Sequence, residues 1–339
     1  MFSSMNAVLF VFSFSTIQLS NVCEAICGKP YFKPIRLSEG LNNNRISNGI
    51  EARKHSHPWQ ALVRVRFGNA TRRCGGSLID WGGSNASDLV LTAAHCLMDT
   101  NVLLAPYEIM EEVQFYLKRL RQKITMAGSR DVFLRGKYIG VPIANASQVS
   151  VSLGLHDTRA LNENMQQLDV VGLAVGHYHQ YTNKEDVGLL KLERKVVYNK
   201  FIQGICLPYP KENLPAIGYT CYVTGWGFLD EKMTEGRRLQ QIEVDIFEKS
   251  KCNSRVNEKT MFCAGSKVNN VGTCSGDSGG PLACQKRGQF ILYGVVSFSM
   301  KGHCSTIDDP TVFTRVPAVL KWVEKEISEF ASDTTTQSK

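Results

Sequence analysis

Gly276-Asp277-Ser278-Gly279-Gly280-Pro281 is the stretch that decides how the rest of this chain is interpreted. A serine between small, flexible residues can occupy a tight turn that exposes its hydroxyl group, and adjacent backbone N–H groups can converge where a carbonyl oxygen develops negative charge. An isolated Gly-Ser-Gly is more often an ordinary turn between strands. The full stretch, with an acid before the serine, indicates a nucleophile, and it predicts a base and an orienting acid elsewhere in the chain.

A histidine and an aspartate upstream fit those two roles. His95 follows the apolar segment Leu91-Thr92-Ala93-Ala94 and precedes Cys96, which can pin it, and an imidazole titrates in the range needed for a base and then an acid near neutral pH. Asp186 stands immediately before an apolar strand, where its carboxylate would be shielded from solvent well enough to orient an imidazole. Taken alone, a histidine is more often structural, and an aspartate at the start of a strand needs no catalytic role. The order His95, Asp186, Ser278 is what favours the catalytic interpretation.

Length, charge and composition fit one globular catalytic unit with extensions. The chain has 339 residues, of which 43% are apolar, and an all-β unit of roughly 200–250 residues fits within it. The formal net charge of +8 favours acidic partners, but no block of lysines and arginines is long enough to indicate nucleic-acid binding. We therefore expect no nucleic-acid partner; protein or peptide substrates as partners are implied only by the motif resemblance given below.

The N-terminal segment has the pattern of a secretory signal peptide. An apolar run at residues 8–14 is too short to span a bilayer, and Cys23-Glu24-Ala25 offers a cleavage site. A buried strand or a membrane anchor are the alternatives, because no Lys or Arg precedes the run. We assign residues 1–25 to a signal peptide and expect a secreted, extracellular protein with no membrane span in its mature form.

Cysteine and asparagine usage agrees with export. Eleven cysteines are an odd number, but loss of Cys23 with the signal peptide leaves enough for five disulfides in an oxidising compartment. Three Asn-X-Ser/Thr sites predict glycosylated surface loops at Asn69, Asn85 and Asn145.

The remaining chain divides into a short tether and a strand-rich unit. Residues 26–45 are interpreted as a tether or propeptide, and Arg45-Ile46 opens a small polar turn that predicts a cut site on an exposed loop, with a plain linker as the alternative. From Trp59 onward, short apolar segments separated by Gly or Asn clusters indicate a barrel or a sandwich. Residues 316–330 change to a helical period, and residues 331–339 are polar and predicted to be disordered.

One internal segment, at about residues 99–147, departs from the strand pattern. Residues 108–123 fit an amphipathic helix and are followed by the basic residues Arg130, Arg135 and Lys137. An adhesive or regulatory role of this insert, independent of catalysis, stays open.

Four motifs in one order resemble the chymotrypsin/trypsin family of serine peptidases. They are TAAHC at residues 92–96, DVGLLKL at residues 186–192, Thr224-Gly225-Trp226-Gly227, and the nucleophile stretch itself. The resemblance implies an all-β fold of two six-stranded antiparallel Greek-key β-barrels with a C-terminal α-helix, in a peptidase domain at residues 46–330. A non-catalytic binding or regulatory protein on the same fold is the alternative, although the intact set of His95, Asp186 and Ser278 argues against it.

The resemblance implies a role for each site residue. Ser278 attacks the scissile carbonyl, His95 takes its proton and later gives it to the leaving amine, and Asp186 fixes the imidazole tautomer. The backbone N–H groups of Gly276 and Ser278 form the oxyanion hole. Ser297-Phe298-Ser299 matches the segment that pairs with the substrate backbone, with Phe298 in place of the usual tryptophan.

The resemblance also implies activation by a protease that cuts after Arg45. The new N-terminus at Ile46 would pair with Asp277 and assemble the oxyanion hole, and breaking such a buried pair costs about 3–5 kcal/mol. Ser47 departs from the aliphatic residue that is usual at the second position. Protein protease inhibitors are possible partners. The implied disulfides are Cys27 with Cys206, Cys74 with Cys96, Cys221 with Cys284, Cys252 with Cys263, and Cys274 with Cys304.

Substrate specificity is expected to differ from that of a trypsin. Gly272 stands where a trypsin carries the aspartate that neutralises Lys or Arg, so cleavage after basic residues is disfavoured. Ser299 and Thr311 stand where deep pockets carry glycine, which favours small or apolar P1 residues, as in elastases. Chymotrypsin-like specificity is one alternative, and basic specificity restored by Asp308 or Asp309 is another.

No metal or cofactor is expected. Leu155 occupies the position at which calcium-binding trypsins carry an acidic ligand. His177 and His179 lie two residues apart without supporting Cys or acid ligands in the sequence.

Overall fold

The computed structural model describes most of the strand-rich unit. The expected signal peptide, the Arg45-Ile46 cleavage site and the expected helix at residues 108–123 lie outside the described residues. The described residues are 27–36, 49–99, 142–160, 163–178, 182–216, 218–252, 256–266, 271–299, 304–306 and 308–336.

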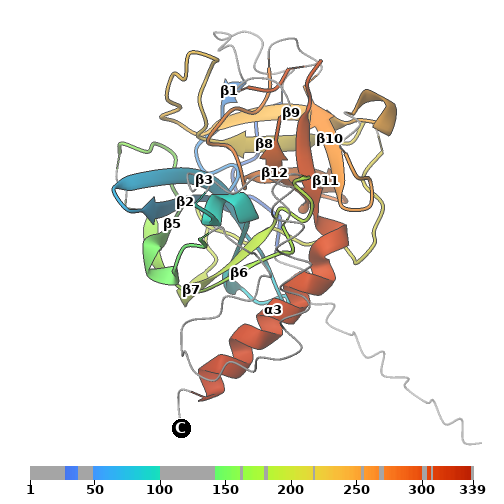
Figure 1. The fold of residues 1–339 in the computed structure, drawn as a ribbon. Coiled ribbons are helices and arrows are strands. Elements are labelled where there is room, and N and C mark those ends of the chain that lie inside the picture. The colour runs from blue at the N-terminus through green and yellow to red at the C-terminus, as the bar shows by residue number, and fades with distance from the viewer. Residues whose placement is uncertain are drawn as a thin grey trace, which may run out of the picture.

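Two closed six-stranded antiparallel β-barrels form the body of the molecule, as the family resemblance implies (Figure 1). The first barrel closes in the order β2-β3-β4-β7-β6-β5. Along its strand β2, Val63 and Val65 are buried in the core while Arg64 and Arg66 lie on the outside, because successive side chains of a strand point to opposite faces. Its strands are β2 (Gln60–Phe67), β3 (Ala70–Leu78), β4 (Ala86–Thr92), β5 (Val149–Leu153), β6 (Gln166–Val175) and β7 (Gly188–Val197).

The second barrel has the order β9-β10-β13-β12-β11-β8 and closes by the pairing of β8 with β9. A short strand, β1 (Ile50–Glu51), pairs with β9 from outside. Leu282, Tyr293 and Phe313 are buried in its core, and the rings of Phe262 and Phe313 stack with centroids 5.4 Å apart. Its strands are β8 (Cys221–Gly225), β9 (Gln240–Ile246), β10 (Met261–Gly265), β11 (Pro281–Lys286), β12 (Gln289–Phe298) and β13 (Thr311–Arg315).

The C-terminal helix α3 (Val316–Thr336) follows β13 directly and packs its apolar face against strands of both barrels, among them β7 and β12; Figure 1 shows its place in the molecule. The face expected from the sequence is the buried one, with Val319, Leu320 and Val323 in the core. The helix is longer than expected, because residues 331–336 continue it where a disordered tail was predicted. Ala331 is a strong helix former and the hydroxyl of Ser332 donates to the backbone carbonyl of Glu329 (2.8 Å), so the extra turn has local support.

The two ends of the insert meet next to the first barrel. Asp99 N–H donates to the carbonyl of Pro142 (2.8 Å), and Ala144 N–H donates to the carbonyl of Leu97 (2.8 Å). Asp99, four residues after His95, and Pro142 therefore lie side by side at the edge of the first barrel.

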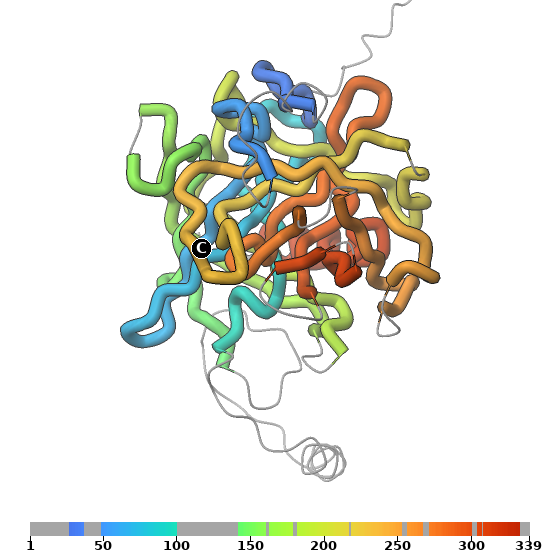
Figure 2. Tube along the Cα trace, turned by 90° about the horizontal axis from the view of Figure 1, so that it is seen from above, coloured from blue at the N-terminus to red at the C-terminus, as the bar shows by residue number. Residues whose placement is uncertain are grey.

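Five disulfides tie the loops to the barrels, and they are the pairs that the resemblance implies. The segment beginning at Cys27 lies against the body beside the β11–β12 turn (Figure 2), where Phe290 N–H donates to the carbonyl of Gly28 (2.7 Å). No helix in the described part of the chain is long and apolar enough to cross a membrane. The disulfides are Cys27–Cys206, Cys74–Cys96, Cys221–Cys284, Cys252–Cys263 and Cys274–Cys304.

Candidate active site

The three candidate catalytic residues come from loops at the junction of the two barrels. His95 lies on the 3-10 helix η1 (Ala94–Leu97), which follows β4 of the first barrel. Asp186 stands two residues before β7 of the same barrel, and Ser278 lies between β10 and β11 of the second barrel. Residues separated by almost two hundred positions in the sequence are thus brought to one place.

A hydrogen-bonded pair joins His95 to the buried carboxylate of Asp186. The ring nitrogen Nδ1 of His95 lies 2.7 Å from Oδ2 of Asp186, and the backbone N–H of His95 donates to Oδ1 (3.0 Å). The Asp186 side chain is buried and also accepts a hydrogen bond from the hydroxyl of Ser297 (2.5 Å). Burial alone would raise the pKa of Asp186, but the His95 ring and these hydrogen bonds outweigh it and hold the pKa below its usual value. The carboxylate is therefore charged near neutral pH and fixes the orientation of the imidazole.

Two residues that support Asp186 were not predicted from the sequence. Ser297 was expected only as part of a segment that pairs with substrate, yet its side chain points to Asp186. The hydroxyl of Thr314 donates to the backbone carbonyl of Asp186 (2.8 Å). Both lie on strands of the second barrel, so this barrel helps to position the acid of the first.

The loop that carries Ser278 is held by both barrels. Gly75 N–H of β3 donates to the carbonyl of Ser278 (2.8 Å), and Gly279 N–H donates to the carbonyl of Val296 on β12 (2.8 Å). Gly279 has a φ of +80°, and a Cβ atom there would lie 2.3 Å from Oγ1 of Thr92. Only glycine fits both this backbone conformation and this close approach.

Ser278 reaches the His95 loop through its backbone. Its carbonyl oxygen lies 3.7 Å from Sγ of Cys96, whereas its hydroxyl forms no hydrogen bond with another described residue. Catalytic hydrogen bonds are often absent or long in structures without substrate. The structure thus contains the hydrogen-bonded pair of His95 and Asp186, and the backbone of Ser278 contacts Cys96, the residue next to His95.

The backbone N–H groups of Gly276 and Ser278 have no acceptor among the described residues. Gly276 has a φ of +100°, which turns the loop sharply before Ser278. These two donors are therefore available to an oxygen atom of a ligand, as an oxyanion hole requires.

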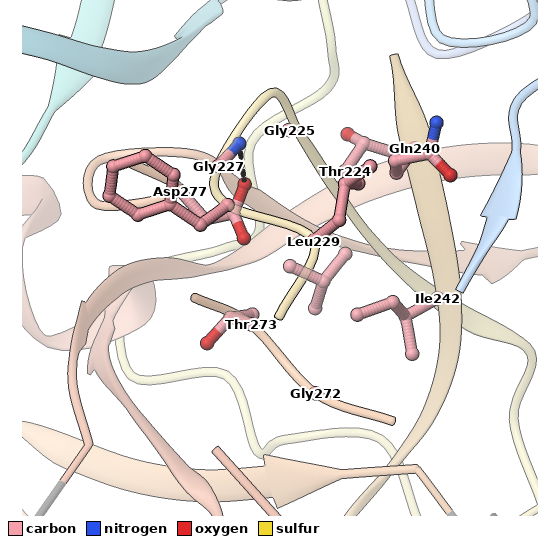
Figure 3. Close-up of a pocket in the computed structure, with 11 residues that line it drawn as sticks. Thr224, Gly225, Gly227, Leu229, Gln240, Ile242, Gly272, Thr273 and Asp277 are labelled. Carbon is pink, nitrogen blue, oxygen red and sulfur yellow. Dashed lines mark hydrogen bonds between the residues drawn. The ribbon is translucent and has the colours of Figure 1, made fainter. Parts of the chain in front are cut away.

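Asp277 is half-buried as a residue, and its carboxylate turns inward to the backbone N–H of Gly227 (Figure 3). It accepts backbone N–H donors from Gly227 (2.8 Å) and Cys274 (2.9 Å), and it forms no ion pair with a described Lys, Arg or His. Burial raises its pKa from 3.8 to about 6, despite those two donors. A Cβ atom on Gly225 would lie 2.1 Å from Oδ1 of Asp277, so the Gly-Trp-Gly motif leaves room for this carboxylate.

A narrow cavity adjoins Asp277. Its water-accessible volume is about 10 Å³, and Thr224, Leu229, Ile242 and Gly272 are among the residues that line it (Figure 3). A small polar or charged group that enters this cavity would meet the unpaired carboxylate of Asp277.

The residues expected to form the specificity pocket lie together at one end of the second barrel. Gly272 is buried, and a Cβ atom there would lie 2.2 Å from the carbonyl oxygen of Ser305. The hydroxyls of Thr273 and Thr311 lie 2.7 Å apart, and Thr311 also donates to Oγ of Ser305 (2.8 Å). Thr273 and Ser305 were not predicted, because only the fold shows that they contact Thr311. Of the two possible sources of basic specificity, Asp308 is exposed to solvent, whereas Asp309 is buried.

The other pocket residues lie at the end of β12. Phe298 packs against the cluster of Val256, Met261 and Val312, and Ser299 is half-buried directly after the strand. The bulk of the missing tryptophan is thus partly replaced by the phenylalanine ring.

Leu155, at the position where calcium-binding trypsins carry an acidic ligand, is packed in a core cluster, and the nearby Asp157 forms an ion pair. Leu155 is buried against Leu62 and Trp226, and the carboxylate of Asp157 pairs with Nε of Arg237 (2.8 Å). In the described part of the chain, no three His, Cys, Asp or Glu side chains are grouped so that they could hold a metal ion.

Comparison with known proteins agrees with this geometry. A family model described as Trypsin matches residues 46–128 and 143–323. Chymotrypsin-C of Bos taurus is 32% identical over 311 residues, which covers 89% of this chain and 93% of the relative. The break in the family match falls inside the insert.

Proposed function

Because the chain belongs to the trypsin family of serine peptidases and is a serine endopeptidase that acts on protein substrates, we propose that it uses Ser278, His95 and Asp186 in an acyl-enzyme mechanism. The observation that carries this proposal is the buried pair of His95 and Asp186, with Nδ1 and Oδ2 2.7 Å apart. With Nδ1–H donated to the carboxylate, Nε2 of His95 is the basic nitrogen that remains to take the proton of Ser278.

The reaction follows from these positions. His95 removes the proton of the Ser278 hydroxyl as the oxygen attacks the scissile carbonyl, and it then protonates the leaving amine. Asp186 stabilises the imidazolium that forms in between. The N–H groups of Gly276 and Ser278 hold the developing oxyanion, and one such donor contributes about 3 kcal/mol to the transition state. In the second half, His95 removes a proton from a water molecule as the water oxygen attacks the acyl carbon, and it returns this proton to the Ser278 oxygen as the ester bond breaks and the acid product leaves.

Cleavage after Arg45 is proposed as the activating step. The new ammonium group of Ile46 would enter the cavity beside Asp277 and pair with its carboxylate, with Ser47 behind it. The raised pKa of Asp277 supports this step, because a buried carboxylate that lacks a cation gains most from one. The partner that performs this cleavage is a protease that recognises Arg45.

We propose that the enzyme prefers small or apolar P1 residues. Gly272 supplies no charge for Lys or Arg, and the neighbouring Ser305 blocks any side chain at that position. The hydroxyls of Thr273, Ser305 and Thr311 bond to one another, so they close the pocket at a short depth. The three hydroxyls supply no charge for a buried cation, so cleavage after Lys or Arg would depend on Asp309, which is buried two residues before Thr311.

We also propose that the protein is secreted and glycosylated. Five disulfides are typical of an oxidising compartment. Asn69, Asn85 and Asn145 are exposed, which supports their use as glycan acceptors.

Hydrolysis of a peptide library by purified protein tests the proposal. Protein cleaved at Arg45 is expected to release peptides after small or apolar residues, while the Arg45→Gln and Ser278→Ala variants release none. Strong cleavage after Arg or Lys would overturn the pocket assignment. Absence of hydrolysis from protein with a confirmed Ile46 terminus would favour a non-catalytic binding protein instead.

A further inference from the structure

Strand β3 contacts the loop of the base and the loop of the nucleophile. Arg72 donates from Nη1 to the backbone carbonyl of His95 (2.8 Å), and further along the strand Gly75 N–H donates to the carbonyl of Ser278 (2.8 Å). Strands of a closed barrel are rigid elements, and such elements hold reacting groups more precisely than loops do. Both loops are thus held by one strand, and Arg72 is the side chain that extends this hold to His95.

The side chain of Arg72 lies on the inner face of β3. The register places Arg72 opposite Val65 of β2, which is fully buried, and residues paired in this way share one face of a sheet. Cys74 lies on the same face, because side chains alternate along a strand, and it is bonded to Cys96. The face of β3 that carries Arg72 is therefore the face that meets the His95 loop.

The guanidinium of Arg72 is itself held in place. Its Nη1 also donates to the carbonyl of Met98 (2.6 Å), and its Cζ lies 5.3 Å from the centre of the Phe67 ring. Burial lowers the pKa of Arg72, and the charge of Asp99 opposes that shift. The two carbonyls supply the acceptors that a half-buried cation needs.

The bond from Arg72 is the stronger hold on the carbonyl of His95. Within η1, the N–H of Met98 reaches this carbonyl only at 3.5 Å, against 2.8 Å from Arg72. The carboxylate of Asp186 holds the N–H and the ring of the same residue. Because a residue has only two soft backbone torsions, fixing both the N–H and the C=O of His95 leaves its imidazole little freedom.

We propose that Arg72 is a positioning residue that sets the place of the His95 ring between Asp186 and Ser278. It acts through the backbone carbonyl of the base, and this role needs no contact with substrate. The inference rests on the proposed mechanism and adds one residue to it. A displacement of about 1 Å at a reacting group can lower a rate by about a hundredfold, so a side chain with this role affects kcat.

Three variants of the protein cleaved at Arg45 test the proposal: Arg72→Gln, Arg72→Lys and the control Arg66→Gln. Arg66 is exposed on the outer face of the same hairpin and lies 3.4 Å from the carbonyl of Ser147, so the control removes the same charge at a position on the other face. A short amide substrate with a chromophore as leaving group gives kcat and KM. Titration with a covalent serine probe counts the active sites, so kcat is expressed per site.

The variants are expected to differ in kcat and not in KM. Arg72→Gln should lower kcat by about tenfold while KM changes by less than about twofold. Arg72→Lys should lower kcat by about threefold, because an ammonium donates to the carbonyls but lacks the planar geometry of a guanidinium. Arg66→Gln should keep the kcat of the parent.

A proton resonance separates positioning from stability. The proton between Nδ1 of His95 and Oδ2 of Asp186 lies in a short hydrogen bond (2.7 Å), which places its NMR signal far downfield of the amide signals. We expect this signal to move in Arg72→Gln, to move less in Arg72→Lys, and to stay in place in Arg66→Gln. A residue that only stabilised the fold would lower the urea midpoint of unfolding and leave both the signal and kcat per site unchanged.

The inference requires both changes, in kcat per site and in the His95 signal, and the absence of either in folded Arg72→Gln would overturn it. If that variant does not fold, Arg72→Lys decides, and a parental kcat with a parental signal would overturn the inference. If the parent protein itself does not hydrolyse the short substrate, the proposed function fails. The NMR signal needs no turnover, so it still shows whether Arg72 positions His95.

Discussion

The buried carboxylate of Asp277 predicts an unusual pH dependence of stability before activation. Its pKa is raised by burial from 3.8 to about 6, so the folded chain binds a proton that the unfolded chain has already released between these pH values. Stability therefore falls as pH rises through this window. A difference of about 2 pKa units corresponds to a destabilisation of the folded state by about 3 kcal/mol. This destabilisation is absent below about pH 4 and fully present above about pH 6.

The Asp277→Asn substitution isolates this contribution. Both proteins would carry Arg45→Gln, so that neither is cleaved, and their free energies of unfolding would be measured in urea from pH 4 to pH 7.5. At pH 4 the protonated aspartic acid and the amide are both neutral, and any difference reflects the two backbone hydrogen bonds. The Asn protein is expected to gain about 3 kcal/mol relative to its parent as the pH rises to 7.

A second pair that keeps Arg45, one protein with Asp277 and one with Asp277→Asn, should behave differently once both are cleaved after Arg45. If the ammonium group of Ile46 pairs with Asp277, it lowers the pKa of that carboxyl and removes the destabilisation. The Asn variant then becomes the less stable protein, by about 3–5 kcal/mol at neutral pH. A stability difference between the uncleaved proteins that does not change with pH would refute the assignment of Asp277 as an unpaired buried carboxylate.

Three further substitutions follow from the site. Asp186→Asn should lower kcat by about 10⁴-fold, because the wrong imidazole tautomer then faces Ser278; a loss below tenfold in steady-state assays would contradict this role. Ser297→Ala removes the hydroxyl donor to Asp186 and should lower kcat by about tenfold with little change in KM, whereas a change in KM alone would indicate a role only in substrate binding. Thr311→Gly should deepen the pocket and raise the relative kcat/KM for aromatic P1 residues by about tenfold, since a side chain of that size contributes about 1–3 kcal/mol, and an unchanged P1 profile would show that Thr311 does not line the pocket.

Motifs with a local signature were predictable from the sequence. The residues around His95, Asp186 and Ser278 each occur in a short recognisable segment, and their order led to the two-barrel fold that the structure contains. The helical period after residue 316 also predicted the buried face of α3. Each of these signals depends on neighbours in the chain, which a sequence displays directly.

Contacts between distant strands were not predictable in the same way. The hydroxyl of Ser297 reaches Asp186 only because the end of β12 lies beside the loop before β7. The bond from Arg72 to the carbonyl of His95 depends on the register of β2 and β3, and a shift by one residue would turn Arg72 to the other face. Spacing along the chain carries no information on such pairs.

The segment Gly225-Trp226-Gly227 combines a local motif that the sequence displays with a long-range contact that it does not. The sequence identifies it as a family motif. Only the structure explains why both positions are glycine, because the carboxylate of Asp277 approaches Gly225 and Gly227 too closely for any side chain. In the same way, the end of α3 was placed too early because the polar composition of residues 331–336 concealed a continued helix.

Covalent labelling of Ser278 tests the central claim most directly. Purified protein would be cleaved at Arg45, its new Ile46 terminus confirmed by mass spectrometry, and the sample treated with a fluorophosphonate probe beside uncleaved protein and His95→Ala. We predict stoichiometric labelling that maps to Ser278 in the cleaved protein, and little labelling in the other two. Cleaved protein that leaves Ser278 unlabelled would contradict the account.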